Sequence, residues 1–98
     1  MASLNWTSEA ESWLTEIYAY IATESATAAD RVVSGIVRRA EVLMQFPYLG
    51  HRFEDIIDRE VRILLFGHYR IAYLVRNDGD VDILGVYHGA LDIARHLR

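Results

Sequence analysis

The hydrophobic pattern of the chain changes at Pro47, its single proline. Before this residue, apolar side chains recur at every third or fourth position, which is the period of a helix with one buried face. After it, they alternate or form short runs, as they do in β-strands. Proline also disfavours helix in the residue that precedes it. The sequence therefore predicts a helical half followed by a sheet half.

Two helices are expected before Pro47, with a short strand possible at 2–6. Ser8 and Glu11 have the S-x-x-E spacing of a capping box, and Thr27 with Asp30 offers a second N-terminal cap. Small polar residues at 23–27 interrupt the apolar stripe, and so short a connection predicts an antiparallel helix hairpin. The aromatic residues of this half are expected mostly in the core: Trp6, Trp13, Tyr18, Tyr20 and Phe46.

Three strands are expected after Pro47. Residues 48–60 are polar and mixed and are predicted to form a loop, followed by strands at 61–66, 69–76 and 81–88. Gly67-His68 and Asn77-Asp78-Gly79 are typical of the two turns between them. A short helix is predicted over 90–98. The fold class is thus α+β, in the order β-α-α-β-β-β, with the helix hairpin on one face of a mainly antiparallel sheet and one domain over 1–98.

The composition narrows the range of functions. All ten basic residues are arginines, and fourteen carboxylates leave a net charge of −4. A dedicated nucleic-acid binder usually has a basic domain or stripe, so this balance weighs against one. The absence of cysteine excludes disulfides and thiolate sites and agrees with a reducing cytoplasm. No targeting or membrane-spanning segment is apparent, and the histidine spacing predicts neither a metal nor a cofactor.

A set of polar side chains on the predicted strands is the candidate site. Its members are Arg62, Tyr69, Arg70, Tyr73, Tyr87 and His88. Arg62 and Arg70 are expected on one sheet face, where they would form an anion site, and His88 is suited to acid or base chemistry. A structural alternative remains open, in which the arginines pair with carboxylates such as Glu54, Asp58 or Glu60 and the histidine bonds to backbone groups.

Three motifs follow the helical half in order: F-P-x-x-G at 46–50, Y-R-I-x-Y at 69–73 and V-x-H-x-x-x-D at 86–92. In this order and spacing, over nearly the whole chain, the sequence resembles the RelE/ParE superfamily of bacterial type II toxins. The resemblance implies a cytoplasmic toxin that is neutralised by an antitoxin, which wraps a partly disordered segment around it. Arg31, Arg38 and Arg39 on the second helix are candidates for the antitoxin contact, although a solvated helix face explains them equally well.

The resemblance leaves two activities open. RelE-like members cleave mRNA on the ribosome with a cluster of basic side chains, and Arg62 and Arg70 match two of these. Leu64 and Gly89 stand where further basic residues would be expected, so the nuclease set is incomplete. We therefore favour the ParE-like branch, whose members bind DNA gyrase and are not nucleases.

The alternative is a ribosome-dependent endonuclease. Its catalytic residues would be Arg62, Arg70 and His88. A further nuclease subgroup uses a glutamate, an arginine and a late histidine, which Glu54, Arg70 and His88 could imitate, and Tyr87 is a further candidate. Whether the protein is an enzyme thus depends on the branch.

Overall fold

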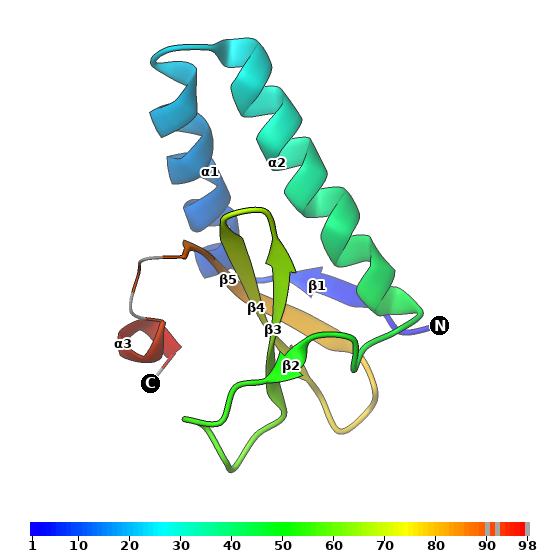
Figure 1. The fold of residues 1–98 in the computed structure, drawn as a ribbon. Helices are drawn as coiled ribbons and strands as arrows, with labels where there is room; N and C mark the ends of the chain where they lie inside the picture. Colours follow the sequence, from blue (N-terminus) through cyan, green and yellow to red (C-terminus); the bar gives the residue numbers. More distant parts are fainter. Residues whose placement is uncertain (90, 92, 98) are drawn as a thin grey trace.

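The computed structural model describes residues 1–89, 91 and 93–97. It has a short strand, two long helices, four further strands and a short helix (Figure 1). The elements are β1 (Leu4–Trp6), α1 (Ser8–Ala22), α2 (Ala26–Glu41), the 3-10 turn η1 (Val42–Met44), β2 (His51–Arg52), β3 (Val61–Phe66), β4 (Tyr69–Val75), β5 (Val81–His88) and α3 (Ala94–Leu97). The predicted α+β class and helix hairpin are confirmed. A terminal helix is present as well, but it begins at Ala94 and not at 90, and positions 90, 92 and 98 of the predicted range lie outside the described residues.

The five strands form one mixed sheet in the order β1-β5-β4-β3-β2. β1 lies at one edge and pairs parallel to β5, and the other pairs are antiparallel. β2 forms the opposite edge, where His51 and Arg52 pair with Ile63 and Arg62. The prediction of a loop throughout 48–60 is wrong at these two residues, because a strand of two residues is too short to produce an alternating pattern.

Both helices begin at a different residue from the one predicted. Thr7, not Ser8, caps α1, and its hydroxyl accepts a 3.1 Å hydrogen bond from the Ala10 N–H. Ser25, not Thr27, caps α2 in the same way. Thr7 is held in the extended conformation that a cap requires because its N–H and hydroxyl both donate to the Ile83 carbonyl of β5. That tertiary contact has no local signature in the sequence.

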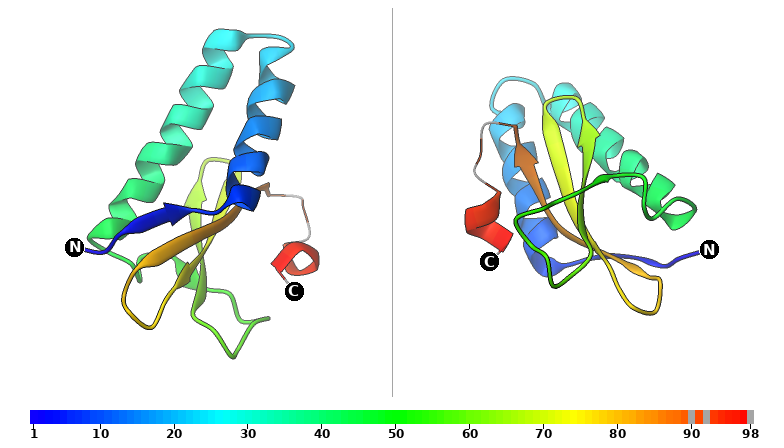
Figure 2. Two further views of the ribbon diagram at one scale, coloured as in Figure 1. Left: turned by 180° about the vertical axis from the view of Figure 1, so that it is seen from behind. Right: turned by 60° about the horizontal axis from the view of Figure 1, so that its bottom comes forward.

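The helix hairpin packs against one face of the sheet (Figure 2). Ile36, Ala40 and Leu43 of the helical layer meet Ile71 and Tyr73 of β4 in the main core. The smaller cluster on the other face contains Ile63, Ala72, Tyr87 and Ile93, with Leu91 and Leu97 packed around it. The residues that lead into α3 thus cover part of the face that the hairpin leaves open.

The end of the hairpin extends beyond the strands (Figure 1). For this reason Tyr18 and Tyr20, near the end of α1, are 37% and 81% exposed, and the prediction that they belong to the core is wrong. Phe46 follows η1 and is 59% exposed, so the core prediction is wrong for this residue as well. Trp6 and Trp13 are partly buried against the core, as predicted.

A β-bulge in β5 determines which side chains face the helices. Ala72 pairs with Gly85 and Tyr73 pairs with Ile83, so Leu84 is the extra residue. The extra residue changes the alternation, and Val86 faces the main core although it lies three positions after Ile83. As a result, Tyr87 belongs to the opposite face of the sheet.

Candidate functional site

Arg62 is bound within the protein on several sides. Its Nε donates to Glu60 Oε2 at 2.8 Å, and its Nη1 donates to the carbonyls of Tyr48, at 3.1 Å, and Gly50. The guanidinium carbon also lies 5.1 Å from the centre of the Tyr48 ring, a cation–π geometry. Glu60 in turn accepts from Arg52. Arg62 therefore fastens the loop before β2 to the sheet.

Tyr73 fastens the same loop from the next strand. Its hydroxyl accepts a 2.9 Å hydrogen bond from the Gly50 N–H and donates a 2.7 Å bond to the Pro47 carbonyl. A Cβ at Gly50 would lie 2.6 Å from the Ile63 carbonyl oxygen and 2.9 Å from the Tyr73 ring. Only glycine fits so close to the sheet, which explains the last position of the F-P-x-x-G motif.

Arg70 holds the segment that follows β5. Its Nη2 donates to the carbonyls of Gly89 and Leu91, at 2.9 and 2.8 Å. Its Nε is buried and has no hydrogen-bond partner among the described residues. The side chain that resembles a nuclease arginine therefore binds backbone carbonyls of its own chain.

Arg62 and Arg70 lie on opposite faces of the sheet. Side chains directly across an antiparallel pair share a face, and Arg62 pairs with Tyr73, which belongs to the main core beneath the helices. Arg70 pairs with Leu65, and three positions along β3 separate Leu65 from Arg62. Because strand side chains alternate, an odd separation changes the face. The prediction that both arginines project from one face is wrong.

His88 and Arg70 reach the same end of the sheet from opposite faces, because His88 pairs with Tyr69 and Arg70 pairs with Tyr87. Both line an open hollow of about 530 Å³ beside the β3–β4 turn, together with His68 and Gly89. The His68 and His88 rings are nearly parallel with centres 6.3 Å apart, and the edge of Tyr69 meets His88 at 5.8 Å. His68 was not predicted as a site residue, and only the hairpin register could have shown that it lies beside His88.

Tyr87 lies below the surface. It is 1% exposed, contacts Trp13 edge to face at 4.9 Å and stacks on His96 at 5.5 Å. Burial, with a smaller effect from Glu9, raises the pKa of its hydroxyl to about 12. That hydroxyl has no hydrogen-bond partner within the described residues. A hydroxyl buried in this way is out of reach of a substrate.

Glu54 is far from Arg70, the arginine of the alternative nuclease set. It follows Phe53, whose N–H donates to the Val61 carbonyl at the start of β3, whereas Arg70 pairs near the end of that strand. A rise of about 3.3 Å per residue over four residues separates the two positions by roughly 13 Å. The structure does not bring Glu54, Arg70 and His88 together.

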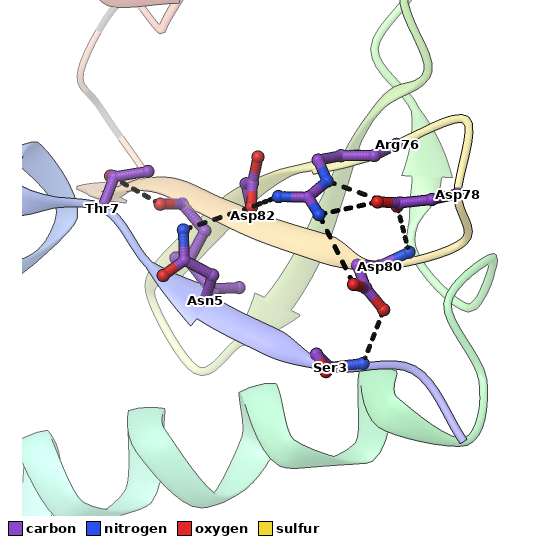
Figure 3. Close-up of polar contacts among 8 residues, drawn as sticks. Ser3, Asn5, Thr7, Arg76, Asp78, Asp80 and Asp82 are labelled. Carbon is purple, nitrogen blue, oxygen red and sulfur yellow. Dashed lines mark hydrogen bonds and ion pairs between the residues drawn. The ribbon is translucent and has the colours of Figure 1, made fainter.

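A cluster of four charged residues lies at the turn between β4 and β5, three in the turn and the fourth, Asp82, in β5 (Figure 3). The Arg76 guanidinium contacts Asp78 at 2.7 Å, Asp82 at 3.3 Å and Asp80 at 3.4 Å. Its proximity holds the pKa of Asp78 below the ordinary value, mainly through their hydrogen bond. Asp80 also accepts from the Ser3 N–H, and Asp82 from the Asn5 amide, so the cluster anchors β1.

The arginines of α2 differ in their surroundings. Arg31 and Arg38 are exposed, whereas the Nε of Arg39 donates to the Leu65 carbonyl at 3.1 Å. Among residues 1–89, 91 and 93–97, no group of three or more histidine, aspartate or glutamate side chains has a metal-binding arrangement. No helix within those ranges has the length and apolar character needed to cross a membrane.

The order of elements and the helix hairpin on a small sheet are those of the RelE/ParE class of bacterial toxins. The sequence matches the family described as ParE toxin of type II toxin-antitoxin system, parDE, over residues 4–93. The chain belongs to this family. No curated protein matches it.

The solved structures that are similar to the chain include two toxin–antitoxin systems. One is a chromosomal ParDE toxin–antitoxin system from P. aeruginosa, with 25% sequence identity and a TM-score of 0.74. The match covers 90% of this chain and 96% of that chain. The other is the RelBE2 toxin–antitoxin complex from Mycobacterium tuberculosis, with 22% identity, coverage of 89% and 96%, and a TM-score of 0.65. At that identity, the second supports the fold alone.

Proposed function

We propose that this toxin acts in the cytoplasm by binding and inhibiting DNA gyrase, and that a cognate antitoxin neutralises it. Membership of the ParE family supports this function. So does the similarity to a ParDE system, in which the toxin family occurs together with its antitoxin. In this account the protein is a binding inhibitor and not an enzyme.

The observation that carries the proposal is the position of the two strand arginines. A nuclease needs its cations convergent on one phosphate and free to bind it. Arg62 and Arg70 lie on opposite faces, and each donates to backbone carbonyls of its own chain. Leu64, at the position of a further basic residue, is 2% exposed in the main core. These positions favour a protein-binding toxin.

The second candidate function is ribosome-dependent cleavage of mRNA. It is supported by the hollow beside the β3–β4 turn, where His68, Arg70 and His88 gather and no described lining residue is acidic. Such a hollow could take a phosphate. His88 would then act as the acid or base, with Arg70 as the phosphate ligand.

Arg31 and Arg38 are our proposed contacts for the antitoxin. They are seven residues apart, two turns of α2, and therefore project from similar sides of the helix. Exposed charges at the rim of an interface mainly affect association rate and salt dependence. Replacing both with alanine should slow antitoxin association and reduce its dependence on salt, as measured by surface plasmon resonance. Unchanged rates would exclude them.

Induction of the toxin without antitoxin tests the choice between the two functions. Gyrase inhibition predicts filamentation and DNA damage while bulk mRNA stays intact, and it predicts that His88→Ala remains toxic. Primer extension on abundant transcripts would detect the other activity. Rapid cleavage at ribosome-bound codons, abolished by His88→Ala, would overturn the proposal.

A further inference from the structure

The negative charge of the protein comes from its first thirty residues. Residues 1–30 contain five carboxylates and no arginine, whereas residues 31–98 contain ten arginines and nine carboxylates. The side chains of the first part therefore carry a charge of −5 and those of the second a charge of +1, which together give the net charge of −4. Glu9, Glu11 and Glu16 lie on α1, which has no basic side chain. α1 is thus an acidic helix.

An apolar groove lies between α1 and the end of the sheet, and we call it the α1 groove. It has a volume of about 390 Å³, and its apolar and aromatic lining residues are Trp13, Ile17, Tyr20, Tyr69, Val86 and Leu91. Tyr20 is 81% exposed, because α1 continues beyond the strands at this point (Figure 1). A large exposed ring beside other apolar side chains is typical of a surface that binds a partner.

Two carboxylates follow the face of α1 that lines the groove. Glu9 and Glu16 are seven residues apart, which places them within about 20° of each other around the helix. Each precedes an aromatic residue of that face by one turn: Glu9 precedes Trp13, and Glu16 precedes Tyr20. Neither carboxylate forms an ion pair with a described residue. The α1 groove therefore has an acidic rim that the protein itself does not neutralise.

The arginines of the chain do not change the charge of this rim. Among the described residues, none that lines the α1 groove is an arginine, and its polar lining residues are Glu16 and His88. Arg70 donates to the carbonyl of Leu91, but it does so from the opposite face of the sheet, because it pairs with Tyr87. A partner that enters the groove beneath α1 therefore meets the carboxylates.

We propose that the α1 groove binds a basic segment of DNA gyrase that carries an apolar anchor, an inference that rests on the function proposed above. An enzyme that handles DNA neutralises phosphates with lysine and arginine, so basic segments are expected on its surface. Lysine or arginine side chains of such a segment would pair with Glu9 and Glu16. An apolar side chain between them would fill the groove and pack against Tyr20.

The charge of α1 also argues against two other occupants. A second copy of the chain would bring two acidic helices together, and like charges across an interface are unfavourable. The antitoxin contacts proposed above, Arg31 and Arg38, lie on α2 and suit carboxylates of that partner. The two helices of the hairpin therefore fit partners of opposite charge.

Binding of the antitoxin-free toxin to purified gyrase, measured by surface plasmon resonance, tests the site. Tyr20→Ala should raise the dissociation constant at least about tenfold, the loss expected on removing an aromatic anchor. Glu16→Arg should raise it by a similar factor at low ionic strength and reduce its dependence on salt. Both side chains are exposed, so both variants should unfold in urea at the same midpoint as the wild type.

Glu11→Arg and Phe46→Ala are the matched controls. Glu11 is on the same helix as Glu16 but five residues away, about 140° around it, so the same charge reversal is made away from the groove. Phe46 is 59% exposed and follows η1, outside the α1 groove. Both controls should leave the dissociation constant unchanged. His88→Ala should also bind gyrase, because it leaves the α1 wall and both carboxylates in place.

Photo-cross-linking identifies the chemistry of the bound segment. A benzoylphenylalanine placed at Tyr20 should cross-link to gyrase, whereas the same group at Phe46 should not. The gyrase peptide recovered from Tyr20 should carry lysine or arginine on both sides of an apolar residue. An acidic or uncharged peptide would overturn the proposal.

The outcomes distinguish this site from the proposed function. If the wild type inhibits gyrase and both Tyr20→Ala and Glu16→Arg inhibit it equally well, the function stands and the groove proposal is wrong. If these variants lose only antitoxin binding, the antitoxin occupies the groove and the proposal is equally wrong. A wild type that does not bind gyrase at any concentration would overturn the proposed function, and the site with it.

Discussion

The Tyr73 hydroxyl accepts a hydrogen bond from the Gly50 N–H at 2.9 Å and donates one to the Pro47 carbonyl. Tyr73→Phe should leave both backbone groups unpaired, and unpaired buried polar groups cost about 1–3 kcal/mol. We expect that loss in the free energy of unfolding, measured by urea denaturation. Tyr69→Phe is the control, since the Tyr69 hydroxyl makes no hydrogen bond within the described part of the chain. Equal stability of the two variants would show that the contact contributes nothing.

Tyr87→Phe should behave in the opposite way. Its hydroxyl is buried without a described partner, so removing it should leave the unfolding free energy at neutral pH unchanged within about 1 kcal/mol, or raise it. The folded-state pKa of Tyr87 is raised from 10.0 to about 12, so the folded state retains this proton and loses stability as pH rises through that interval. Tyr87→Phe should flatten this alkaline loss. Tyr20→Phe, at an 81% exposed position, should not.

Arg70→Ala should loosen the segment after β5. Without the guanidinium, the Gly89 and Leu91 carbonyls lose their hydrogen bonds to a charged group. Hydrogen bonds of this kind contribute about 1.5–3 kcal/mol to stability. Hydrogen exchange of the Leu91 and Leu97 amides should then accelerate at least about tenfold. Arg95→Ala, an exposed change in the same segment, is the control. Unchanged exchange would mean that Arg70 does not anchor the segment.

Asp78→Asn should reduce the pH dependence of stability on the acid side. Arg76 lowers the folded-state pKa of Asp78 below the ordinary 3.8, so the carboxylate stabilises the fold above that value and its contribution is lost as pH falls through the lowered pKa. The variant should lose less stability than the wild type over this range in urea denaturation. Because the Arg76–Asp78 ion pair is exposed, added salt should reduce the difference between the variant and the wild type. Identical acid profiles would contradict this.

The sequence predicted the elements well because hydrophobic period and turn residues are local signals. The opposite placement of Arg62 and Arg70 could also have been predicted. A two-residue turn at 67–68 pairs 66 with 69, and counting along the strands then pairs Arg62 with Tyr73 and Leu65 with Arg70. Neighbouring strands alone do not imply a shared face, because the register of the pairing decides which side chains lie together.

Other features depend on tertiary contacts that no local pattern reveals. The Leu84 bulge, which places Tyr87 away from the helices, follows from pairing between β4 and β5. The cap at Thr7 depends on the Ile83 carbonyl, far along the chain. Likewise, the positions of Tyr73 and Arg62 beneath the loop could be known only once β3 and β4 were placed under it. The sequence therefore indicated which residue types matter, but the role of each residue could not be predicted from it.

The most direct test of the account is a supercoiling assay with purified gyrase, relaxed plasmid and the antitoxin-free toxin. We predict inhibition that reaches completion near stoichiometric toxin, survives His88→Ala and is reversed by the antitoxin. A parallel reaction with translating ribosomes should leave the message intact. Full gyrase activity at excess toxin, together with message cleavage that His88→Ala abolishes, would contradict the central claim.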